Sequence, residues 1–134
     1  MCIRDRGLAV VPIFAGYDLA RETGRLFEYD ITGGRYEESD YAATGSGSLH
    51  AETVIKVGYR RSMSLDDAVD LLAESLFQAA DADAATGGAD PLRGIYPIMV
   101  TVSAEGFERL EDDDVATRFA TIADRFSANH RETN

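Results

Sequence analysis

Two segments of the chain are almost wholly apolar, residues 7–16 (GLAVVPIFAG) and residues 94–103 (GIYPIMVTVS). Near-continuous apolar runs of this length are typical of strands that are buried on both faces of a sheet. Residues 26–31 and 35–42 are also strand-like, and they flank Thr32-Gly33-Gly34. Because glycine readily adopts the positive φ values that tight turns require, this pattern predicts a β-hairpin.

Helical spacing is found in the middle of the chain. Residues 49–59 predict one helix, which would begin in the Gly-Ser run that precedes it. Ser64 is placed as the N-cap of a second helix, with Asp66 and Asp67 in the first turn, where acids interact favourably with the helix dipole. Apolar residues then return at helical spacing and predict one buried face, made of Ala68, Val69, Leu71, Leu72, Leu76 and Ala79.

After the second apolar segment, Ala104-Glu105-Gly106 predicts a turn into a short strand over residues 107–110. Residues 112–114 are all aspartate and open a last predicted helix. The apolar face of this helix would carry Val115, Phe119, Ile122 and Phe126. The polar residues 127–134 are expected to fray.

Two long helices on a largely antiparallel sheet predict an α+β layered domain. The two apolar strands need cover on both faces, and the chain has too few other strands to supply a second layer. Each large apolar side chain left uncovered forgoes roughly 1.5 to 3 kcal/mol of burial free energy. Several such losses would rival the whole stability of a domain, which is about 5 to 15 kcal/mol. We therefore expect the isolated chain to be unstable or to aggregate.

The composition, 45% hydrophobic and 28% charged over 134 residues, is that of one soluble globular domain with a modest core. No apolar run approaches a membrane helix and no signal-peptide pattern opens the chain, so we expect a cytoplasmic protein without a membrane partner. The single cysteine, Cys2, excludes an internal disulfide. A net charge of -11 disfavours nucleic acid as a partner.

The first six residues, MCIRDR, match the translation of a transposase adapter used to build sequencing libraries. We expect residues 1–6 to be such an artefact, residues 7–128 to form part of a single domain, and residues 129–134 to be a frayed tail. An ordinary N-terminus that happens to carry this hexamer is the alternative. The acidic character of the chain remains when the six residues are removed.

Two short motifs carry the candidate chemistry, YAATGSGS at residues 41–48 and DAATGG at residues 83–88. On composition alone, the first is a flexible loop into a helix with a serine cap. The second is a helix C-terminus stopped by glycine, because glycine readily adopts the left-handed cap conformation. Gly87 and Gly88 are accordingly expected to be structural.

Several other functional motifs are excluded, because the sequence lacks the residue spacing that they require. A nucleophile elbow centred on Ser46 would need glycine at the positions of Thr44 and Ser48. A dinucleotide fingerprint would need a third glycine at the position of His50. His50 and His130 have no cysteine partners at metal-ligand spacing, so we expect no metal and no cofactor.

The two motifs, in this order, resemble the C-terminal portion of a bacterial proteasome β subunit of the actinobacterial type. The likeness extends over the chain from Gly7 onward and includes the GYD, DAVDLL and RGIYPIMV segments. It implies the four-layer αββα sandwich of the N-terminal-nucleophile hydrolases and the activity of a threonine-type endopeptidase. It also implies a barrel in which β subunits form a seven-membered ring, stacked on α-subunit rings, that degrades unfolded polypeptides in the cytoplasm.

That family attacks the peptide carbonyl with the hydroxyl of an N-terminal threonine, whose α-amine serves as the base. The match implies that Ser46 contacts this amine and that Asp83 and Thr86 complete the same network. Ala84 stands where many relatives carry serine, so a hydroxyl contact is absent there. Asp30 matches a segment that faces a neighbouring subunit's substrate channel, although a solvated hairpin acid is an equally good interpretation.

The nucleophile, the lysine and aspartate beside it, and the oxyanion donor would all lie upstream of Gly7, so we expect this chain alone to be inactive. Two other hypotheses stay open. The parent protein could be a noncatalytic ring subunit, either α-type or an inactive β-like one. The chain could also be a free-standing α+β module that binds a partner through its acidic surface.

Overall fold

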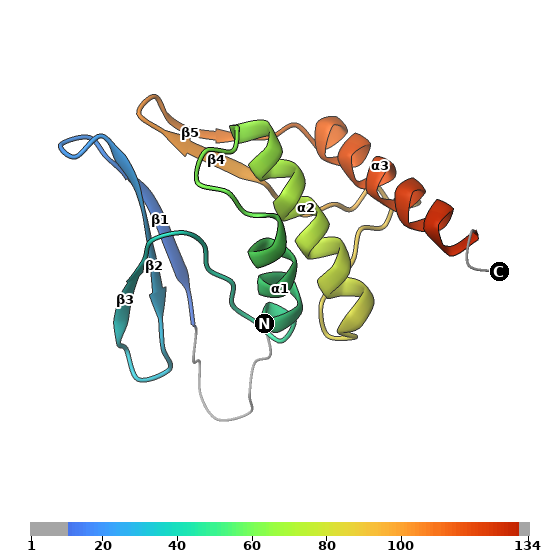
Figure 1. Cartoon of the computed structure of the whole chain (residues 1–134), viewed down its shortest axis with the longest axis horizontal. Helices are drawn as coiled ribbons and strands as arrows, with labels where there is room; N and C mark the ends of the chain where they lie inside the picture. Colours follow the sequence, from blue (N-terminus) through green and yellow to red (C-terminus); the bar gives the residue numbers. More distant parts are fainter. Residues whose placement is uncertain (1–10, 132–134) are drawn as a thin grey trace.

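The computed structural model describes residues 11–131 and combines helices with antiparallel strands, as the sequence predicts. Three helices lie together on one side, and the strands lie beside and behind them (Figure 1). In chain order the elements are β1 (Ile13–Asp18), β2 (Thr23–Tyr29), β3 (Arg35–Glu38), α1 (Ser48–Gly58), α2 (Leu65–Ala82), β4 (Val100–Ser103), β5 (Gly106–Arg109) and α3 (Asp112–Arg131).

The strands form a three-stranded antiparallel sheet, ordered β1-β2-β3, and a two-stranded hairpin of β4 and β5. The predicted first hairpin is confirmed: β2 pairs with β3, and Gly33 in the turn has a φ of 89°. The β4–β5 turn is confirmed as well, with Gly106 at a φ of 111°. β1 contacts β4, so the two sheets are neighbours. Residues 7–10 of the first apolar segment lie outside the described part of the chain.

The prediction of one continuous strand over residues 94–103 is wrong. Only Val100–Ser103 forms a strand, and the preceding residues make a turn closed by a bridge between Asp90 and Ile95. Pro97 explains the difference, because proline has no N–H to donate to a strand ladder. Ile98 is 71% exposed, so this apolar segment is not fully covered by the described part of the chain.

The helices begin where the sequence indicates. Ser64 caps α2, since its hydroxyl accepts a hydrogen bond from the Asp67 amide at 3.1 Å. The buried face of α2 differs from the prediction, because Leu72 and Leu76 stay 44% and 36% exposed beside a pocket described below. α3 continues to Arg131, so residues 127–131 are helical where fraying was expected.

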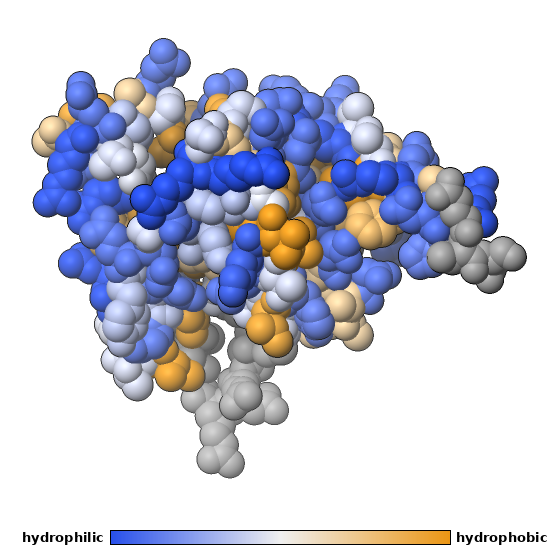
Figure 2. Space-filling model, in the orientation of Figure 1, coloured by the Kyte–Doolittle hydropathy of each residue, from blue (hydrophilic) through white to orange (hydrophobic). Residues whose placement is uncertain are grey.

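The core lies between α2, α3 and the segment that leads into β4. Two aromatic pairs extend it, Tyr96 with Phe119 and Phe77 with Phe126, the latter stacked at 5.2 Å between ring centres. The buried cluster consists of Val69, Ala73, Met99, Val115, Phe119 and Ile122. Three of the four residues predicted for the apolar face of α3 are therefore buried, and Phe126 packs against them. Outside this cluster, the face in Figure 2 is mostly hydrophilic with separate apolar patches.

Helices α1 and α2 pack against each other as a pair joined by a short turn (Figure 1). They cross closely at Gly58, where an added Cβ would lie 2.5 Å from Leu71 Cδ1. Asp40 attaches the turn to the preceding loop by accepting hydrogen bonds from Arg61 at 2.9 Å and from the Tyr59 hydroxyl at 3.3 Å. This pair of helices determines where the two sequence motifs meet.

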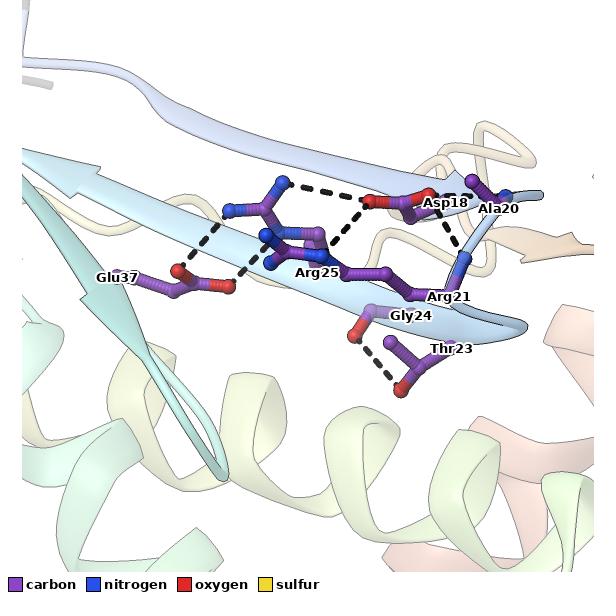
Figure 3. A network of polar contacts seen from close by, with 7 residues as sticks. All are labelled: Asp18, Ala20, Arg21, Thr23, Gly24, Arg25 and Glu37. Carbon is purple, nitrogen blue, oxygen red and sulfur yellow. Dashed lines mark hydrogen bonds and ion pairs between the residues drawn. The ribbon is translucent and has the colours of Figure 1, made fainter.

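An ion-pair network crosses one face of the first sheet (Figure 3). Arg25 on β2 donates to Glu37 on β3 at 2.9 Å and to Asp18 at the end of β1 at 3.4 Å. Arg25 and Arg35 also lie over the Phe27 ring, at 4.9 and 5.1 Å from its centre. The network links all three strands, although exposed ion pairs of this kind contribute little stability one by one.

Arg118 on α3 is the most heavily paired cation of residues 11–131, with three carboxylate partners. Its guanidinium donates to Asp66 and Asp70 on α2, each at 2.5 Å, and to Asp114 on α3 at 3.2 Å. Its side chain is only 15% exposed. These contacts raise the pKa of Arg118 and fasten the start of α3 to the start of α2.

Replacing Arg118 with methionine is therefore expected to lower the free energy of unfolding by about 1 to 3 kcal/mol, since three carboxylates lose their charged donor. Arg125→Met is the matched control, because Arg125 is 55% exposed and Glu74 is its single carboxylate partner among the described residues. That change should cost less than about 1 kcal/mol. Urea unfolding of a full-length subunit that carries this chain, followed by helical circular dichroism, measures both values. Equal losses for the two variants would contradict the expectation.

Candidate active-site cluster

The first motif forms an irregular loop that leads into α1. Gly45 has a φ of 105°, a conformation that favours glycine, and its carbonyl accepts a hydrogen bond from the Ser48 amide at 3.2 Å. The loop was predicted, but the serine cap was not placed correctly. The N-cap of α1 is Gly47, which supplies no side-chain hydrogen bond, and the Ser46 hydroxyl is directed elsewhere.

The Ser46 hydroxyl donates a hydrogen bond to Oδ2 of Asp83, 37 residues further along the chain, at 2.5 Å. The Thr86 hydroxyl donates to the same oxygen at 2.6 Å, and the Ala85 amide donates to Oδ1 at 3.2 Å. Helix α2 ends at Ala82, and its C-cap is Asp83, in an extended conformation, rather than a glycine as composition suggested. The structure thus brings together the three residues that the sequence singled out, here called the Ser46–Asp83–Thr86 cluster.

The cluster holds a carboxylate in its charged form. Hydrogen bonds from Ser46 and then Thr86 lower the pKa of Asp83, with smaller contributions from the Ala85 amide and His50, while partial burial opposes them. Both hydroxyls donate their hydrogens to Asp83, so towards any other group their oxygens can only accept hydrogen bonds. A group that donates hydrogen bonds and carries positive charge, such as a protonated amine, is the ligand that this arrangement favours.

An open pocket of about 500 Å³ lies beside the cluster. Ser46 and Thr86 are on its wall, together with the helix N-terminus at Gly47 and Ser48. The rest of the lining is mainly apolar and comes from α1, α2, β1 and the segment before β4: Ile13, Ile55, Val69, Leu72, Leu76, Ile98 and Met99. The polar cluster therefore borders a largely apolar cavity, a common composition for a binding site.

Asp30 does not join this cluster. Its Oδ1 accepts hydrogen bonds from the Thr32 amide, the Thr32 hydroxyl and the Gly34 amide, at 2.7 to 2.9 Å, and its Oδ2 accepts from the Tyr36 hydroxyl at 2.9 Å. These contacts hold the β2–β3 turn together. The geometry therefore favours the interpretation of Asp30 as a hairpin acid, while its contact with substrate stays a prediction.

The same contacts, first among them the Thr32 hydroxyl, lower the pKa of Asp30 from 3.8 to about 2. The hairpin should be fully stabilised by Asp30 above about pH 4 and should lose this contribution as the pH falls towards about 2. Asp30→Ala removes the pH-dependent part, so the stability difference between the two proteins should shrink across this range. The variant should also lower the pKa of Tyr36, which the hydrogen bond to Asp30 raises. NMR titration of both side chains measures these shifts, and an unchanged Tyr36 would contradict the assignment.

Gly47 is a site residue that sequence reasoning missed. It is buried, and the composition of residues 45–48 placed it only in a flexible loop. The sequence did offer one signal. Gly47 stands next to the candidate Ser46 at the expected start of a helix, a position where serine, aspartate and asparagine are the better caps.

The described residues were also compared with the requirements of a metal site and of a membrane-spanning helix. Among residues 11–131, no group of three or more His, Cys, Asp or Glu side chains is positioned to hold a metal ion. Within the same part of the chain, no helix combines the length and the apolar character that crossing a bilayer requires.

Comparison with known proteins agrees with the motifs. Residues 3–90, which include the whole Ser46–Asp83–Thr86 cluster, match the family model described as "Proteasome subunit". The chain is 51% identical over 120 residues to "Proteasome subunit beta" of Streptomyces griseus and 49% identical over 121 residues to "Proteasome subunit beta" of Frankia casuarinae. Each match covers 90% of this chain but only 43% and 44% of the relative, so the chain spans less than half the length of either. The chain belongs to the proteasome subunit family, and the resemblance drawn from its motifs is confirmed.

Proposed function

We propose that this chain is the C-terminal part of a proteasome β subunit that acts as a threonine-type endopeptidase. The observation that carries the proposal is the Ser46–Asp83–Thr86 cluster beside the apolar pocket. In the full-length subunit, the α-amine of an N-terminal threonine would occupy the acceptor face of this cluster. The chain alone would then be an inactive part of the enzyme.

The chemistry of the cluster suits the base that such a reaction needs. An α-amine has an ordinary pKa of about 7.7 to 8, so a usable fraction is unprotonated near neutral pH. The oxygens of Ser46 and Thr86 would accept hydrogen bonds from the amine and orient its lone pair towards the threonine hydroxyl. When the amine takes the hydroxyl proton, it becomes an ammonium ion, which the nearby Asp83 carboxylate stabilises.

The apolar pocket supports a further part of the proposal. The exposed side chains of Leu72 and Ile98 border a cavity that the described part of the chain leaves open. The part of the relatives that has no counterpart here is long enough to supply more strands and helices. We infer that this part completes a four-layer αββα sandwich, and that the completed subunit assembles into seven-membered β rings with α rings in the cytoplasm and degrades unfolded polypeptides.

A joined subunit tests the proposal. It would carry the preceding part of the Streptomyces griseus relative followed by this chain from residue 11, and it would be produced together with the α subunit of that organism. We expect it to assemble into a large particle and to hydrolyse a fluorogenic peptide, and we expect replacement of its N-terminal threonine by alanine to abolish hydrolysis. An assembled particle without threonine-dependent hydrolysis would favour a noncatalytic ring subunit instead.

A further inference from the structure

We propose that Gly47 is a positioning residue, whose missing side chain leaves the space in which Thr86 reaches Asp83. For its effect on catalysis, this inference rests on the proposed function. The geometric part stands on the structure of the chain alone.

The conformation of Gly47 does not require glycine. Its φ of -88° and ψ of 4° are accessible to any L-residue, unlike those of Gly45, which has a φ of 105°. Its carbonyl accepts the hydrogen bond from the Ala51 amide that starts α1, at 3.1 Å, and alanine would preserve this bond. A residue with a capping side chain would serve the helix better. The reason for glycine at this position is therefore space.

The space beside Gly47 is bordered by residues at the end of α2 and just after it. A Cβ added to Gly47 would lie 2.5 Å from the Thr86 hydroxyl oxygen, 3.3 Å from the Ala79 Cβ and 3.5 Å from Oδ2 of Asp83. The Thr86 oxygen is held at 2.6 Å from Asp83, so it cannot withdraw without breaking that hydrogen bond. Ala79 belongs to the helix and cannot yield without moving α2. A methyl group would thus either turn Thr86 away from Asp83 or push the ends of α1 and α2 apart.

The experiment uses the joined subunit in four forms: unchanged, Gly47→Ala, Thr86→Ala and the double variant. Gly47→Ala is expected to lower kcat roughly tenfold or more while KM changes less than about twofold, because the catalytic groups are misplaced and the substrate pocket is kept. In the Thr86→Ala background the clashing oxygen is gone, so the same change should lower kcat less than about threefold. Gly24→Ala is the control, since an added Cβ there meets nothing within 4 Å.

Equal losses of kcat in both backgrounds would show that Gly47 acts only at the helix start and would overturn the proposal, as would an unchanged kcat for Gly47→Ala. Urea unfolding midpoints of the same four proteins give an independent test. If the shifts in midpoint caused by the two substitutions are not additive, the geometric inference is supported, even when no form hydrolyses peptide. A lack of hydrolysis in all forms would count only against the proposed function. Additive midpoints would contradict the inference even in an active enzyme.

Discussion

Replacing Asp83 with asparagine in the joined subunit is expected to lower kcat by roughly 10²- to 10⁴-fold with little change in KM. Asparagine keeps the size of the side chain but carries no charge, so the ammonium formed during proton transfer would lose its counter-ion. Its amide nitrogen also cannot accept a hydrogen bond in place of a carboxylate oxygen. Steady-state hydrolysis of a fluorogenic peptide measures the effect.

Asp81→Asn is the matched control, because Asp81 is an exposed acid one residue before the end of α2 and only two residues from Asp83. We expect its kinetics to equal those of the unchanged subunit. The Asp83 variant should also fail to cleave a propeptide placed before the threonine, since the same base would serve both reactions. Normal kinetics and normal self-cleavage in that variant would refute the role that we give to Asp83.

The 134-residue chain on its own is expected to hydrolyse no peptide above the buffer rate and to form aggregates. The proposed nucleophile is not part of the cluster, and the pocket beside it exposes apolar surface. Ile98 on the pocket wall is 71% exposed, Phe14 on β1 is 60% exposed, and apolar areas of this kind favour association. Peptide hydrolysis, light scattering and sedimentation measure the two properties.

Ile98→Thr provides the comparison for the aggregation experiment, because it keeps the branched shape and reduces the apolar area beside the pocket. We expect this variant to scatter less light than the unchanged chain at equal concentration. A monodisperse, monomeric chain that melts cooperatively would contradict the expectation. It would favour a free-standing binding module over a part of a longer enzyme.

Elements determined by local sequence could be predicted well. The Gly33-Gly34 hairpin and the Ser64 cap of α2 each depend on residues a few positions apart, and both are found in the structure. The strand over residues 94–103 was predicted too long, since its apolar pattern outweighed the effect of Pro97. The exposure of Leu72 could not be predicted from helical spacing, because spacing identifies an apolar face but not whether another segment covers it.

In the candidate site, too, some residues could be identified from the sequence and others could not. Ser46, Asp83 and Thr86 were found through the resemblance of two motifs, and no periodicity would have joined residues so far apart. Gly47 was missed because its proposed role depends on close contacts between the start of α1 and the residues around the end of α2. Steric demands of this kind are visible only when the non-local packing is known.

The hydrogen bond between Ser46 and Asp83 joins the open end of the α1–α2 pair, opposite the short turn that connects the helices. The Ser46–Asp83–Thr86 cluster therefore closes a unit of consecutive residues, and the geometry of the cluster depends on how often that end of the helix pair separates. Brief separations that leave α3 and the core intact would disperse the three side chains long before the domain unfolds. When the joined subunit is warmed, its peptide hydrolysis should then be lost before its helical circular dichroism signal. The amides around Ala85 and Thr86 should be the first to exchange their hydrogens with solvent.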